Sequence, residues 1–162
     1  MTKEMGFIHM KSEFVLAIQV FAKLNKSRRW EYKLQVYEKW RWSKDVTLLA
    51  FKKHPICMLL SEDKITKSMN FLVNEMGWPS EAIARYPLIL FFSLEKRIVP
   101  RCSVVQVLKL KGLIQTDVSL ATLMTCKEEK FLKNVVANFP ENAPLLLDVY
   151  KGQMGPLDVV AS

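Results

Sequence analysis

The lysine and arginine side chains of this sequence are the best candidates for a binding function, because their number and placement favour a polyanionic partner. The chain of 162 residues carries 24 of them against 16 aspartates and glutamates, a formal net charge of +8. Residues 21–53 hold ten basic and three acidic side chains, whereas residues 54–162 hold twelve and eleven. Almost all of the excess therefore lies in one short stretch. The alternative is that this stretch forms the solvated exterior of helices.

Five basic residues in this stretch are candidates for contacts with phosphate: Arg28, Arg29, Arg41, Lys52 and Lys53. Cations that line up along a phosphate backbone release counterions on binding, so their affinity falls as salt rises. Phosphate contacts position a protein but carry no sequence information directly. We therefore expect binding that is sequence-tolerant or modestly selective.

A second set of candidates comes later in the chain and comprises Lys64, Lys96, Arg97 and Arg101. Arg97 and Arg101 are four residues apart and so share one face of a helix. Lys96 lies near the predicted start of that helix, where unpaired backbone amides also favour phosphate. Lys64 is the matching residue one repeat earlier. The alternative is ordinary exposed charge beside neighbouring carboxylates, which contributes little.

Residue patterns for catalysis or metal binding are scarce. The sequence has two histidines, no CxxC pair and no glycines spaced for a phosphate-binding loop. His54 has Tyr86 as its counterpart in the next repeat, which favours a packing role over general-base chemistry. We therefore predict a protein that is not an enzyme and has no metal, no cofactor and no small-molecule substrate.

The cysteines and tryptophans fit a protein interior. Three cysteines without a pairing pattern indicate reduced, buried thiols of an intracellular compartment. Four tryptophans could stack on bases: Trp30, Trp40, Trp42 and Trp78. Trp42 and Trp78 occupy equivalent repeat positions, which favours packing between repeats, whereas for Trp30, beside Arg28 and Arg29, both interpretations stay open.

No segment of the sequence predicts membrane insertion or export. No apolar run reaches the ~18 residues that a membrane-spanning helix needs. The N-terminus resembles neither a secretory signal nor an Arg- and Ser-rich transit peptide. We expect no membrane partner, and either the protein needs no targeting segment or that segment lies outside this chain.

The chain that positions these side chains repeats itself. A similar junction returns at spacings of 35, 36 and 35 residues, at Gly6-Phe7, Arg41-Trp42, Gly77-Trp78 and Gly112-Leu113. Two further landmarks, which begin at Lys53 and Ser61, return 32 residues later. A period of this length indicates stacked helical units.

Each unit predicts a helix, a turn ended by proline, and a second helix. Natural N-caps precede the apolar segments at Ser43, Ser61, Ser80 and Ser93. Thr125 and Glu128 match a capping box. Pro55 and Pro87 should stop the first helices of their units, because the residue before proline avoids helical backbone. Pro100 should kink the helix that contains it.

The predicted fold class is all-α, a solenoid of roughly 35-residue helix-turn-helix repeats. Strict period-two alternation is scarce, so we expect no sheet. Glycines 77 and 112 should stop the second helices of their units. We expect a single repeat domain over residues 1–162, with units at about 7–41, 42–77, 78–112 and 113–152.

The order and spacing of these landmarks resemble the mitochondrial transcription termination factor (mTERF) family, especially its plant members. The resemblance covers about residues 5–152. The resembling segments are FKKHP (51–55), SEDKI (61–65), MNFLVNEMGW (69–78), YPLIL (86–90), SLEKRI (93–98) and LDVYKG (147–152). The chain holds three to four units where longer members have more, which is expected of a short or truncated form.

The resemblance implies a right-handed superhelix whose concave basic face holds double-stranded nucleic acid in mitochondria or chloroplasts. It implies double-stranded DNA binding and regulation of organellar transcription, including termination, and we expect a monomer. One alternative is organellar RNA binding in intron splicing or ribosome assembly. Another is a helical scaffold for protein partners.

Overall fold

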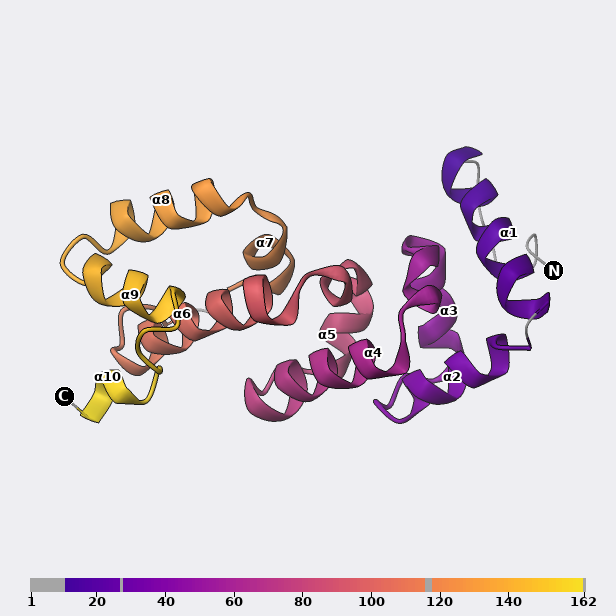
Figure 1. The fold of residues 1–162 in the computed structure, drawn as a ribbon, viewed down its shortest axis with the longest axis horizontal. Helices are drawn as coiled ribbons and strands as arrows, with labels where there is room; N and C mark the ends of the chain where they lie inside the picture. The colour runs from indigo at the N-terminus through magenta and orange to yellow at the C-terminus, as the bar shows by residue number, and fades with distance from the viewer. Residues whose placement is uncertain (1–10, 27, 116–117, 162) are drawn as a thin grey trace. The chain divides into compact units, whose positions relative to one another are not determined.

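The computed structural model of the protein describes residues 11–26, 28–115 and 118–161. Within these residues the fold is all-α and has no β-strand, which confirms the predicted fold class (Figure 1). The α-helices are α1 (Lys11–Lys26), α2 (Trp30–Glu38), α3 (Lys44–Lys53), α4 (Glu62–Met69), α5 (Ser80–Arg85), α6 (Val99–Leu110), α7 (Leu120–Thr125), α8 (Glu128–Asn138), α9 (Ala143–Tyr150) and α10 (Asp158–Ala161). Short 3₁₀ segments are η1 (Pro55–Leu59) and η3 (Pro87–Phe91), and π-helical segments are η2 (Asn70–Glu75) and η4 (Leu94–Ile98).

The helices form two compact units. One unit ends at Phe91 and the other begins at Phe92. This boundary lies inside the predicted repeat 78–112. The single repeat domain with four units, and the handedness of its superhelix, therefore remain predictions.

The first unit is built around the turns that follow α3 and α5. Helix α1 packs on η1, α3 packs on both η1 and α5, and η1 contacts η3. Apolar side chains from each element meet in this core, including Trp42, Phe51, Met58, Ile65 and Leu90, all with 1% exposure or less. Burial of side chains this large supplies the main stabilisation of a small helical unit.

Proline ends the first helices of the middle repeats, as the sequence predicts. Helix α3 stops at Lys53, His54 is its C-cap, and η1 begins at Pro55. Helix α5 stops at Arg85, Tyr86 is its C-cap, and η3 begins at Pro87. The prolines cannot donate to the preceding turn, so the chain tightens into a 3₁₀ segment instead.

Three of the predicted serine caps are confirmed. The hydroxyl of Ser43 accepts a hydrogen bond from the Val46 amide at 3.2 Å. Ser61 and Ser93 cap the amides three residues later at 3.2 and 3.1 Å. Each bond satisfies one of the amide groups that a helix start leaves unpaired.

Two predicted caps are wrong. Ser80 is the first residue of α5, and its hydroxyl accepts from Trp42 Nε1 at 2.9 Å and donates to the Trp40 carbonyl at 2.6 Å. Thr125 ends α7 and donates to the Ala121 carbonyl at 2.7 Å, so it does not cap α8. In both cases a tertiary or preceding-turn partner competes successfully with the local cap.

The repeat junctions share one backbone conformation. Gly77, Gly112 and Gly152 have φ of +72°, +67° and +74°, and Arg41 adopts the same left-handed region at +63°. In each case the next amide donates back across the last helical turn, as Trp42 does to the Tyr37 carbonyl at 3.3 Å. The junctions are therefore Schellman-type helix stops. The Gly6 junction lies outside the described residues.

The second unit packs α6 against α9, and α9 against α8. The π-helical turn η4 passes into α6 at Val99, so Pro100 lies at the change from one helix type to the other. A residue without an N–H fits that position because the regular ladder is interrupted there. Buried side chains of the unit include Ile98, Cys102, Val107 and Leu146.

Candidate nucleic-acid interface

Arg101 is not part of a phosphate-binding surface, because its side chain is only 1% exposed. Its Nη1 donates to the carbonyls of Leu123 and Cys126 at 2.7 and 2.8 Å. The guanidinium also lies 5.0 Å from the centre of the Phe131 ring. The prediction that this residue contacts phosphate is therefore wrong. The cation instead ties α6 to the turn between α7 and α8.

A further connection runs from this arginine to Tyr150 on α9. Burial and the hydrogen bond from Tyr150 to Glu128 Oε1 (2.8 Å) raise the pKa of the tyrosine, and Arg101 opposes that rise. Arginine, tyrosine and glutamate thus link α6, α9 and α8. The exposed carboxylate of Glu128 is the only one of the three groups that faces solvent freely.

Arg97 and Lys96 lie one turn earlier and reach the surface to different degrees. Arg97 is half-buried, its Nη1 donates to the Met124 carbonyl at 3.3 Å, and its guanidinium lies 4.5 Å from the centre of the Phe92 ring. Lys96 is exposed, and its amide is held by Ser93. Lys96 therefore presents the more accessible positive charge of the pair.

Lys64, Lys52 and Lys53 lie in the first unit. Lys64 occupies the same position after Ser61 as Lys96 does after Ser93, and it is half-buried. Lys52 is half-buried at the end of α3, and exposed Lys53 donates from Nζ to the Arg85 carbonyl at 3.0 Å. Lys53 Nζ also lies 5.9 Å from the centre of the Tyr86 ring, so part of its donor capacity is used within the unit.

Arg28, Arg29 and Arg41 are the exposed arginines of the first unit's turns. Arg28 and Arg41 have φ of +54° and +63°, and both are exposed. The Arg29 amide donates to the Leu24 carbonyl at 2.9 Å, so the end of α1 is the same kind of helix stop as the repeat junctions. Two arginines thus occupy a backbone conformation that glycine adopts at lower cost.

Two lysines of the basic stretch that were not among the candidates, Lys33 in α2 and Lys39 directly after it, behave differently. Lys33 is buried and donates to the Leu60 carbonyl, and burial, reinforced by Arg29, lowers its pKa. Lys39 is exposed and pairs with Glu62 at 2.8 Å. The ammonium of Lys39 and the hydroxyl of Tyr32 both donate to Glu62 and lower the pKa of that carboxyl. These contacts join α2 to α4 at the surface.

Two of the four tryptophans, Trp30 and Trp42, are buried inside the first unit. Trp42 is 1% exposed and stacks on Tyr37 with ring centres 4.6 Å apart. Trp30 makes edge contacts with Phe21 and Phe51 at 5.0 and 5.1 Å. Trp40 and Trp78 are half-buried, so each keeps some of its surface in contact with solvent.

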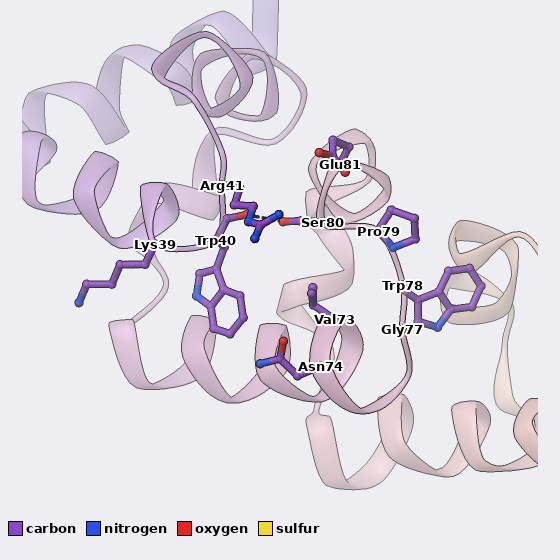
Figure 2. Close-up of a pocket in the computed structure, with 10 residues that line it drawn as sticks. All are labelled: Lys39, Trp40, Arg41, Val73, Asn74, Gly77, Trp78, Pro79, Ser80 and Glu81. Carbon is purple, nitrogen blue, oxygen red and sulfur yellow. Dashed lines mark hydrogen bonds between the residues drawn. The ribbon is translucent and has the colours of Figure 1, made fainter.

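A pocket of about 600 Å³ opens where the Arg41 junction meets the Gly77 junction (Figure 2). Its lining comprises Lys39, Trp40, Arg41, Val73, Asn74, Gly77, Trp78, Pro79, Ser80 and Glu81. The hydrogen bond from Ser80 to the Trp40 carbonyl holds the two junctions together. The sequence signal for this pocket is the recurrence of the junctions, but only the fold shows that two consecutive junctions face each other.

The described residues show no metal centre and no membrane span. Within residues 11–26, 28–115 and 118–161, no three histidine, cysteine, aspartate or glutamate side chains gather closely enough to hold a metal ion. No helix in that part of the chain combines the length and apolarity required to cross a bilayer. Cys57 and Cys102 are buried thiols, and Cys126 is half-buried rather than buried as expected.

Residues 17–132 of the chain match the family described as mTERF. The chain is 37% identical over 95 residues to a protein of Arabidopsis thaliana named "Transcription termination factor MTERF15, mitochondrial". That alignment covers 57% of this chain and 21% of the relative, so the matched part spans about a fifth of the relative's length. No solved structure matches the chain.

Proposed function

Because the chain belongs to the mTERF family, we propose that it binds nucleic acid through exposed cations and acts in the expression of organellar genes. The observation that carries the proposal is the accessibility of the predicted cations. Arg28, Arg29, Arg41, Lys53 and Lys96 are exposed in a chain of net charge +8. Their role is electrostatic docking on phosphates rather than catalysis.

Double-stranded DNA is the proposed ligand, and regulation of transcription, including termination, is the proposed role. The name of the relative places that protein in mitochondria and in transcription termination. We extend both to this chain as a proposal and keep mitochondrion and chloroplast as the two candidate compartments. Docking on duplex DNA would obstruct or recruit a polymerase.

The test is the salt dependence of binding to a DNA duplex. Five phosphate contacts give a slope of about −4.5 in a plot of log affinity against log salt. The double substitution Arg28→Gln and Arg29→Gln should reduce the slope to about −2.7, since each lost contact removes about 0.9. A slope near zero for the unmodified protein would reject electrostatic docking.

A matched control removes two exposed cations outside the candidate set. Lys130→Gln with Lys133→Gln takes the same charge from α8, where both lysines are exposed. This control should leave the slope close to that of the unmodified protein. Equal effects of the two double variants would show that the charge acts as a whole and that Arg28 and Arg29 form no particular site.

RNA is the second candidate ligand, because the pocket at the Arg41 junction combines an aromatic ring with a cation and an amide. Competition between duplex DNA, structured RNA and single-stranded RNA measures the preference directly. A protein that binds none of the three at low salt would favour the remaining alternative, a scaffold for protein partners.

A further inference from the structure

We propose that the pocket at the Arg41 junction binds one unpaired nucleotide of a single-stranded nucleic acid, with its base on Trp40 and its phosphate on Arg41. The proposal rests on the proposed nucleic-acid function and adds a ligand subsite to it. The volume of about 600 Å³ lies in the range of about 300–1,000 Å³ typical of small-molecule pockets.

The backbone of Arg41 is the first argument. At the equivalent junctions the left-handed residue is Gly77 or Gly112, which lacks the Cβ that makes this conformation costly. Arg41 takes the same conformation at φ +63°, although glycine at this position would end the helix equally well. A residue that is strained and replaceable for folding points to a role for its side chain outside the fold.

The guanidinium of Arg41 is also available. It is exposed, and among the described residues it has neither a hydrogen bond nor a carboxylate partner. Lys39, the other cation of the lining, is already paired with Glu62 at 2.8 Å. Arg41 is therefore the group in this pocket that can form the paired, planar hydrogen bonds that arginine makes to phosphate.

The walls of the pocket match a base. Figure 2 shows the Trp40 ring on one side with Val73 and Asn74 across from it, whereas the Trp78 ring points away. Trp40 thus offers a flat aromatic surface on which any base can stack. The side-chain nitrogen of Asn74 donates to Asn70 at 2.8 Å, which leaves the Asn74 oxygen to accept a hydrogen bond from a base.

The ligand has to be unpaired. A base inside a duplex is stacked on both faces, so it cannot present a face to Trp40 in a concave pocket. RNA and DNA single strands share the required chemistry, a planar base beside a phosphodiester. The 2′-hydroxyl distinguishes them, and the experiment separates them by comparing both strands.

The experiment compares a single-stranded oligonucleotide with an abasic strand of the same length, which keeps the phosphates and lacks the bases. The intact strand should bind the unmodified protein on the order of tenfold more tightly than the abasic strand, the scale of one base stacked on an aromatic ring. Trp40→Leu should abolish this preference. Arg41→Gly should weaken binding of both strands and raise the melting temperature, because it relieves the left-handed arginine.

Arg28→Gly is the matched control, because it removes the same charge at the same backbone conformation outside the pocket. It should weaken both strands and keep the preference for the intact one. A preference that survives in Trp40→Leu, or an Arg41→Gly variant that binds as tightly as the unmodified protein, would overturn the proposal. Absence of binding to any nucleic acid would instead overturn the proposed function. If the intact strand is preferred over the abasic strand by the same factor in RNA and in DNA, the pocket does not distinguish ribose from deoxyribose.

Discussion

Replacing Arg101 with methionine tests how the second unit is held together. The arginine is 1% exposed, and its Nη1 donates to the carbonyls of Leu123 and Cys126 at 2.7 and 2.8 Å. Methionine is unbranched and apolar, ends two atoms short of the guanidinium nitrogens, and has no donor. The variant Arg101→Met therefore takes the guanidinium donor from both carbonyls, of which Leu123 keeps a contact with the Cys126 thiol at 3.7 Å, and it removes the cation from the face of Phe131.

The size of the effect follows from opposing contributions. Each buried carbonyl left without a donor costs about 1–3 kcal/mol. The substitution also removes a destabilising contribution, which offsets part of this loss in the free energy of unfolding. Desolvating a charge is expensive, and Arg101 Nε is itself buried without a partner. We expect a net loss of about 2–4 kcal/mol in the free energy of unfolding of the second unit.

The assay has to report on that unit alone. All four tryptophans precede Phe91, so tryptophan fluorescence follows the first unit. Amide hydrogen exchange in α6 and α8 follows the second, and protection there should fall by about 30- to 900-fold for this loss, at 1.36 kcal/mol per factor of ten. Arg97→Met is the control: its one bond, to Met124, is longer at 3.3 Å and its side chain is half-buried, so its effect should be smaller.

Equal protection in Arg101→Met and the unmodified protein would refute the reasoning, as would equal losses in Arg101→Met and Arg97→Met. Either result would mean that the guanidinium does not hold the α7–α8 turn. Under the same reasoning Arg101→Met keeps the salt slope of nucleic-acid binding measured on folded protein, because Arg101 has no access to phosphate. A reduced slope would reinstate it as a contact residue.

Ser80→Ala removes the hydroxyl between Trp42 Nε1 and the Trp40 carbonyl and should lower the free energy of unfolding by about 1–2 kcal/mol; urea denaturation followed by tryptophan fluorescence measures it, and an unchanged midpoint contradicts it. Gly77→Ala places a Cβ at φ +72° and should cost about 1–2 kcal/mol, measured as a lower melting temperature; the space around it is open, so an unchanged value would show that the turn relaxes. Burial raises the pKa of the Cys57 and Cys102 thiols from 9.0 to about 12, so between these pH values the unfolded thiols ionise while the folded ones keep their protons. Stability should then fall as pH rises across that interval, and substituting both cysteines with alanine should flatten the fall in alkaline denaturation; a slope identical to that of the unmodified protein would argue against the burial effect.

The helix caps and helix stops could be predicted from the sequence because they depend on neighbouring residues. Ser43, Ser61 and Ser93 cap amides three residues away, and Pro55 and Pro87 act on the residue directly before them. Such interactions are complete within one helical turn. The all-α class follows, since each unit repeats the same signals.

The predicted caps failed where another hydrogen-bond partner competed with the local one: Thr125 bonds to the Ala121 carbonyl in the preceding turn, and Ser80 bonds to a distant segment. Ser80 has the sequence of a cap, yet its hydroxyl bonds to Trp40 and Trp42, some 40 residues earlier. Cys126 was predicted to be a buried thiol but is half-buried in the fold. No local pattern contains the information that decides these positions.

The sequence by itself determined the helices, their stops, their repetition and the overall excess of positive charge, because propensity, capping and charge are properties of short segments. Tertiary structure alone decided which cations meet solvent. Arg97 in η4 and Arg101 in α6 are the same residue type four positions apart, yet the packing of α6 against the α7–α8 turn buries Arg101 and leaves Arg97 partly exposed. Lys33 is buried as well, and its ammonium donates to the carbonyl of Leu60. The side chain of Arg41 is exposed and lines the pocket between two successive junctions. The reason is that burial depends on what the rest of the chain brings against a side chain, and hydrogen bonds between distant segments carry no signature in the residues on either side.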